Sequence, residues 1–156
     1  HWTGKEQALL GVVDVDGVSY RFMGKETPEE GASVRFATAA RQLSVNVLPT
    51  QTYYTFECGP VLLDVVFTAP LLLDDLDRMS MPVNYISWQV RSADQKKHEV
   101  RVSVEAFSSL AVNTEDQAVM VEREVENGIS YLKTGTAEQA VLLRKGDDVR
   151  IGWGYF

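Results

Sequence analysis

Residues 83–92 read Val-Asn-Tyr-Ile-Ser-Trp-Gln-Val-Arg-Ser, and this stretch decides the fold class. Its apolar and polar side chains alternate: Ile86, Trp88 and Val90 fall on one side, and Ser87, Gln89 and Arg91 on the other. Successive side chains of a β-strand point to opposite faces, so this period of two predicts a strand with one buried face. Residues 99–107 repeat the pattern. We expect six apolar residues to be buried: Ile86, Trp88, Val90, Val100, Val102 and Val104.

Turn signals separate further strand patterns along the chain. Asp16-Gly17 lies between residues 8–15 and 18–23, and Asn127-Gly128 lies between residues 119–125 and 129–133. Both dipeptides favour a two-residue hairpin turn, because a type I′ turn needs positive φ at both central positions. Other strand patterns cover residues 43–48, 52–58, 61–68 and 149–156. The sequence therefore predicts an all-β fold, an antiparallel β-sandwich of roughly nine or ten strands, with helix in under about one-tenth of the residues.

Length and charge set the broad class. The 156 residues are 45% hydrophobic and 24% charged, which is typical of one globular domain over residues 1–156. The net charge of −7 disfavours binding to nucleic acid, and no apolar run approaches the ~20 residues that span a bilayer. The chain lacks an initiator Met and stops in an aromatic run. We expect it to be a piece of a larger multidomain protein.

Few side chains offer catalytic chemistry. His1 and His98 have no His, Cys or Glu partner at metal-ligand spacing, so we interpret both as surface histidines. The single cysteine, Cys58, is interpreted as a small buried hydrophobe rather than a nucleophile. We therefore predict no catalytic residue, no metal and no cofactor in this chain.

The connection over residues 70–82 carries Asp74, Asp75 and Asp77 within four positions. Oxygen ligands on a flexible loop suit calcium, although the Gly and Glu positions of an EF-hand loop are missing. The alternatives are a solvated loop or a helical turn capped by Asp carboxylates. The connection is longer than a hairpin needs, and long ordered connections are often functional.

Apolar and aromatic residues near both ends suggest a surface that meets another domain, because such runs are rarely left in water. The candidate interface residues are Trp2, Asp74, Asp75, Asp77, Trp153 and Tyr155.

Four regions, in order along the chain, resemble a known family: residues 1–7 with 15–24, residues 47–57, residues 67–78 with 82–85 and 90–92, and residues 144–155. They resemble the N-terminal β domain of glutaminase A-like proteins, which are large secreted proteins. The resemblance implies a secreted or periplasmic parent protein that hydrolyses glutamine. It also implies a partner, a C-terminal helical domain of the same protein that resembles the α/α barrels of glycoside hydrolases. No catalytic residue of the family maps onto this chain.

Three functional hypotheses follow. The first is a non-catalytic sandwich that packs against the helical domain of a glutaminase-like hydrolase. The second is a carbohydrate-binding, lectin-like module, and the third is an enzyme in its own right, which the missing catalytic set disfavours. Exposed Trp and Tyr gathered on an open face would favour glycan binding, whereas their position at a docking end would favour the first hypothesis.

Overall fold

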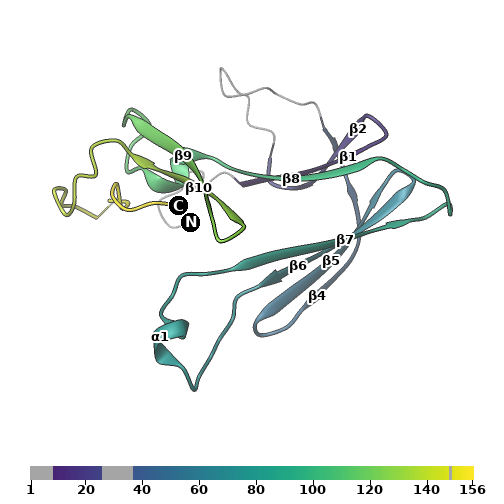
Figure 1. The fold of residues 1–156 in the computed structure, drawn as a ribbon, viewed down its shortest axis with the longest axis horizontal. Coiled ribbons are helices and arrows are strands. Elements are labelled where there is room, and N and C mark those ends of the chain that lie inside the picture. Colours follow the sequence, from purple (N-terminus) through teal and green to yellow (C-terminus); the bar gives the residue numbers. More distant parts are fainter. Residues whose placement is uncertain (1–8, 26–36, 148) are drawn as a thin grey trace. The chain divides into compact units, whose positions relative to one another are not determined.

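The computed structural model describes residues 9–25, 37–147 and 149–156, of which 51% are in strands and 6% in helices (Figure 1). The strands in this part of the chain are β1 (Leu9–Val15), β2 (Val18–Met23), β3 (Thr38–Ala39), β4 (Arg41–Val47), β5 (Gln51–Cys58), β6 (Val61–Thr68), β7 (Tyr85–Ser92), β8 (Val100–Ala106), β9 (Val119–Glu126) and β10 (Ile129–Thr136). A short helix α1 (Leu76–Met79) and a 3₁₀ turn (Ser108–Ala111) complete the elements. The predicted all-β, sandwich-like fold and low helix content are confirmed.

The chain divides into two compact units. Residues 10–104 form the first, and residues 105–156 with Leu9 form the second. The expectation of one domain over residues 1–156 stays a prediction. Within the described residues, no helix is long and apolar enough to cross a membrane.

The first unit consists of two sheets that pack face to face. The β1 sheet has the order β3-β2-β1-β8, and the β6 sheet has the order β4-β5-β6-β7. Their strands pair in antiparallel fashion wherever the register is resolved, except that β2 and β3 pair in parallel. The buried core lies between the sheets and comes from β1, β2, β5 and β6: Val13, Val15, Phe22, Phe56, Cys58, Val61, Leu63 and Val65. The two sheets form separate layers in Figure 1.

Two-residue turns close the hairpins as the sequence predicts. Asp16 and Gly17 have φ angles of 50° and 85°, and Asn127 and Gly128 have φ angles of 50° and 80°. These positive angles at both central residues fit the type I′ turn. A third tight turn, Gly59-Pro60, joins β5 to β6, and the φ of +60° at Gly59 fits a type II′ turn.

Two of the six residues expected in the core are exposed. Ile86, Val90, Val100 and Val102 are partly buried and pack against the core cluster. Trp88 is 50% exposed to solvent and Val104 is 38% exposed, so the prediction of burial was wrong for these two residues. None of the six is fully buried, and all six lie on β7 or β8, which are edge strands of their sheets. An edge strand has a neighbour on one side only, so its inward side chains receive less cover than those of a central strand.

The second unit is built on the β9–β10 hairpin, whose register runs from Ile129 opposite Glu126 to Thr136 opposite Val119. The predicted strand over residues 149–156 is absent, because the chain there is irregular. Gly154 has a φ of +79°, which is incompatible with an extended strand. One backbone pair, with hydrogen bonds of 3.0 and 2.9 Å between Thr134 and Phe156, aligns the end of this segment with β10.

Buried and half-buried polar side chains hold this segment by hydrogen bonds, in place of the backbone pairing of a strand. Thr136 donates from Oγ1 to the carbonyl of Gly152 at 2.6 Å. The amide of Gln139 bonds the backbone N–H of Gly154 at 2.7 Å, and Asn113 Oδ1 accepts from the N–H of Arg150 at 2.7 Å. Because these bonds satisfy backbone groups that would otherwise be unpaired, the segment is ordered without being a strand.

We predict that Gly17→Val lowers the free energy of unfolding by about 1 kcal/mol or more, because a β-branched residue resists positive φ. No atom lies within 4 Å of the position a Cβ would take at Gly17, so the penalty comes from the backbone and not from a clash. Gly17→Asn is the matched control and should cost less, since Asn tolerates this conformation. Urea denaturation of the three proteins measures the difference, and equal stability of the Val and Asn variants would contradict the type I′ turn.

Candidate docking surface

The register of the β6 sheet arranges its inward-facing side chains in four rows across the strands. These rows are Cys58–Val61–Ser92, Gln42–Phe56–Leu63–Val90, Val45–Tyr54–Val65–Trp88 and Val47–Thr52–Phe67–Ile86. In the first two rows the residues of β5 and β6 are buried in the core. In the last two, Val45 is 48% exposed, Val47 is 71% exposed and Trp88 is half exposed. The inward face is therefore covered at one end. At the other end Val65 on β6 is fully buried, whereas Val45, Val47 and Trp88 on the edge strands β4 and β7 are open to solvent.

We call this open region the apolar end and define it by Val45, Val47, Tyr54, Phe67, Ile86 and Trp88. Tyr54 and Phe67 stack edge to face, with ring centroids 5.8 Å apart, and both are partly buried against the core cluster. The apolar end thus joins ordered core side chains to exposed ones on the same face of one sheet.

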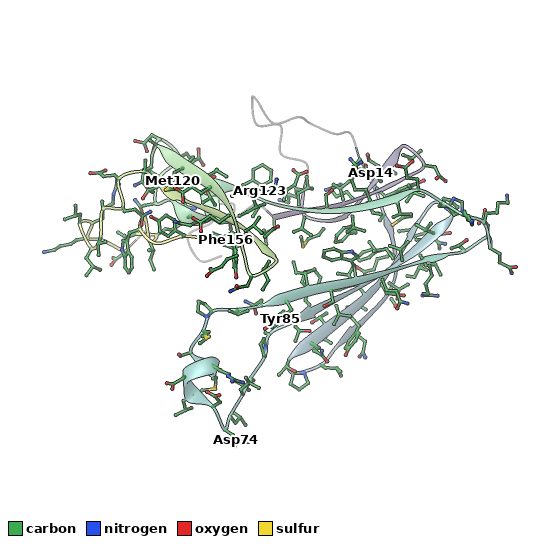
Figure 2. The ribbon with its side chains drawn as sticks, in the orientation of Figure 1. Asp14, Asp74, Tyr85, Met120, Arg123 and Phe156 are labelled. Carbon is green, nitrogen blue, oxygen red and sulfur yellow. The ribbon has the colours of Figure 1, made fainter. Side chains whose placement is uncertain are left out.

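The connection between β6 and β7 starts from the same end of the sheet, where Thr68 pairs with Tyr85. It carries six exposed apolar side chains: Leu71, Leu72, Leu73, Leu76, Met81 and Val83. The α1 helix inside it has no buried residue. Figure 2 shows Asp74 at the far tip of this loop from Tyr85. The loop therefore adds exposed apolar side chains beyond the same end of the sheet.

The aspartates of this loop have different roles. Asp75 is the N-cap of α1: its carboxylate accepts from the N–H of Arg78 at 3.0 Å and pairs with the Arg78 guanidinium at 3.2 Å. The interpretation as a helical turn capped by an Asp is thus confirmed for Asp75. Asp74 and Asp77 are exposed. Among the described residues, no three His, Cys, Asp or Glu side chains are grouped to hold a metal ion.

The remaining interface candidates lie elsewhere in the chain. Trp153 and Tyr155 belong to the second unit. Trp153 is half-buried and lines a pocket of about 200 Å³ with Leu142, Leu143 and Ile151, and the ring of Tyr155 lies 4.2 Å from the Lys133 ammonium. Trp2 lies outside the described residues. The assignment of all these residues to an interface stays a prediction.

The outer face of the β6 sheet has a different character. Tyr53 and Tyr85 are exposed there, and the Tyr53 hydroxyl bonds Gln51 at 2.7 Å. Asp64 accepts from Thr55 at 2.8 Å and from Arg91 at 2.9 Å. The outer face is thus polar, and many of its side chains already bond one another.

His98 is not the surface histidine that the sequence suggested. Only 10% of its side chain is exposed, and its ring lies between two carboxylates. Nδ1 lies 2.6 Å from Asp16 Oδ2, and Nε2 lies 2.8 Å from Asp94 Oδ1. The hydrogen bonds to Asp94 and then to Asp16 raise the pKa of His98 above its usual value. Asp16 is 82 positions away in sequence, so no local motif signals this cluster.

Cys58 is fully buried in the core, as the sequence predicted. Burial raises the pKa of its thiol to about 11, with a smaller contribution from the charge of Glu57. A thiol in this position is neutral at physiological pH and has no access to a substrate, so it is unsuited to act as a nucleophile.

Comparison with known proteins identifies the family. Residues 50–156 match the family described as "Domain of unknown function (DUF5127)". Glutaminase A of Aspergillus oryzae is 24% identical over 155 residues, which are 98% of this chain and 21% of that protein. The chain thus spans about a fifth of the length of this relative. No solved structure matches the chain. The resemblance to glutaminase A-like proteins is confirmed, and the chain belongs to the DUF5127 family.

Proposed function

We propose that this chain is a non-catalytic β-sandwich module of a glutaminase A-like amidohydrolase, and that it packs against a helical catalytic domain of the same protein. The observation that carries the proposal is the apolar end of the β6 sheet, together with the apolar β6–β7 loop. Large exposed apolar patches on soluble proteins mark interaction sites. The small share of the A. oryzae glutaminase that this chain covers supports a partner within the same protein.

The geometry of the two groups best suited to catalysis supports a non-catalytic role. Cys58 is enclosed in the core as a neutral thiol. Both ring nitrogens of His98 are engaged by Asp16 and Asp94, so neither nitrogen is available to accept a proton from a substrate. The module would then contribute by shaping and stabilising the catalytic domain. The secreted or periplasmic location stays an expectation.

One observation favours the carbohydrate-binding alternative. Tyr53 and Tyr85 are exposed on the polar outer face of the β6 sheet, beside amide, carboxylate and guanidinium groups that suit sugar hydroxyls. Trp88, however, lies on the inner face with the apolar end. Saturable binding of an oligosaccharide by the wild-type chain, lost in Tyr85→Ala, would establish the alternative.

We predict that the purified chain releases no ammonia from glutamine, whereas the full-length protein does. A coupled glutamate dehydrogenase assay measures both. Ammonia release by the chain that persists through further purification and is lost in Cys58→Ser or His98→Gln would contradict the non-catalytic role.

We predict that Val47→Asp disrupts docking, because it places a charge on the apolar end that would be desolvated on packing. Val18→Asp is the matched control, since Val18 is also an exposed strand valine, at 51% exposure, but belongs to the β1 sheet. In the isolated chain the two variants should melt within about 2 °C of each other, because surface substitutions change stability little. In the full-length protein only Val47→Asp should lower the melting temperature or the glutaminase rate. Equal effects of both variants there would exclude the apolar end from the interface.

We predict that the triple variant Asp74→Asn, Asp75→Asn, Asp77→Asn lowers the melting temperature of the full-length protein more than that of the isolated chain. Charged groups at an interface help to set how the two surfaces align, and these charges would meet a partner only in the full-length protein. Thermal unfolding of both forms, with and without calcium and with a chelator, measures the effect. Calcium binding inside this loop predicts the opposite pattern: the isolated chain would lose stability with chelator, regain it with calcium, and lose this response in the triple variant.

A further inference from the structure

Three ionisable side chains meet in the first unit: Asp16, and the sequence neighbours Asp94 and His98. His98 stands just before β8, Asp16 is in the β1–β2 turn, and Asp94 follows β7. The imidazole lies between the two carboxylates at 2.6 and 2.8 Å. Its side chain is nine-tenths covered, while those of Asp16 and Asp94 are 49% and 35% exposed. The histidine is thus enclosed while its partners remain in contact with solvent.

Further hydrogen bonds tie this cluster to the backbone on both sides. Asp16 and Glu99 exchange two bonds: the Asp16 N–H donates to the Glu99 carbonyl at 3.0 Å, and the Glu99 N–H donates to Asp16 Oδ1 at 2.9 Å. Asp94 Oδ1 accepts from Ser92 Oγ at 3.1 Å and from the Lys96 N–H at 3.0 Å. The cluster therefore holds the connection of residues 93–99 to the β1–β2 turn.

The position of the His98 ring between two carboxylates requires that the ring be protonated on both nitrogens. Ionised carboxylates only accept hydrogen bonds, so both ring nitrogens of His98 must donate, and only the imidazolium has two N–H groups. Loss of one proton would leave a ring nitrogen lone pair facing a carboxylate oxygen. Asp94 has a further charged partner among the described residues, because the Lys96 ammonium lies 3.7 Å from Asp94 Oδ2. It balances part of the negative charge but makes no contact with the imidazole that would replace a lost bond.

We propose that Asp16, His98 and Asp94 form a pH-sensitive lock, which holds the β7–β8 connection to the β1–β2 turn while the imidazole carries its proton and releases the connection when that proton is lost. This device is independent of the proposed docking function, because it involves none of the residues of the apolar end or the β6–β7 loop.

The direction of the pH dependence follows from the pKa shifts. The pKa of His98 is raised, so its stabilisation is complete below its usual value of about 6.5 and is lost as pH rises through the raised pKa. The hydrogen bonds from His98 lower the pKa of both Asp94 and Asp16. Their stabilisation is therefore present above about pH 4 and is lost as pH falls through the lowered values. The lock is closed between the lowered pKa values of the two carboxyl groups and the raised pKa of His98, and it weakens on either side.

The chain contains two histidines, His1 and His98, which makes the test direct. Proton NMR of the imidazole signals in the wild-type chain gives both pKa values, and His1→Gln assigns them while serving as the matched control. We expect His98 to titrate above about 6.5 and its pKa to fall in Asp94→Asn, which removes one carboxylate charge without removing much volume. A wild-type His98 pKa at or below that usual value would overturn the lock.

Amide hydrogen exchange measures the release of the β7–β8 connection directly. The amides of Lys96 and Glu99 bond the two carboxylates. Their protection, corrected for the intrinsic pH dependence of exchange, should therefore fall at least about threefold between pH 5.5 and a pH one unit above the His98 pKa that NMR measures. Amides of the β5–β6 ladder are the internal reference and should keep their protection. In His98→Gln, which cannot titrate, this difference between pH values should disappear, while His1→Gln should behave as wild type. Protection at Lys96 and Glu99 that is independent of pH in the wild-type chain would also overturn the proposal, whether or not His98→Gln folds.

Discussion

The β1 and β6 strands bury their inward side chains against each other, and the arrangement of residues 10–104 depends on that contact. Val13 and Val15 from β1 share one cluster with Val61, Leu63 and Val65 from β6, all nearly or fully inaccessible. Each such side chain contributes about 1.5–3 kcal/mol relative to an exposed one. Strands β2 and β8 pair with β1, and strands β5 and β7 pair with β6. Their inward side chains are covered only as far as the opposite sheet extends.

This dependence explains which features of the fold could be predicted from sequence. Alternation with a period of two identifies strands and assigns each side chain to a face, because it is a property of the strand itself. Asp-Gly and Asn-Gly identify the I′ turns for the same local reason. The burial of Trp88 could not be predicted in this way: alternation with Ile86 and Val90 gives its face correctly, but whether the face is covered depends on the other sheet.

Other differences between expectation and structure have physical causes of their own. The apolar residues 149–156 matched a strand pattern, yet positive φ at Gly154 prevents one, and side chains such as Asn113 and Gln139 satisfy the backbone instead. Of the candidate site, the sequence indicated the acidic loop and offered capping by an Asp carboxylate as one alternative, and Asp75 fills that role. The apolar end needed the register of four strands, and the surroundings of His98 needed the position of Asp16, far away in the chain.

The two faces of the β6 sheet differ in what a partner would have to displace. On the outer face, Asp64 is engaged by Thr55 and Arg91, and a partner covering it would desolvate an ion pair with little to gain in return. On the inner face, a partner that covers Val47 and Trp88 removes apolar surface from water, which is favourable by about 25 cal/mol for each Å² buried. It would do so without breaking a hydrogen bond that the structure shows for these two side chains. Burial of equal area is therefore more favourable on the inner face. The free energy of association thus favours the apolar end over the outer face as the surface that a second domain would cover.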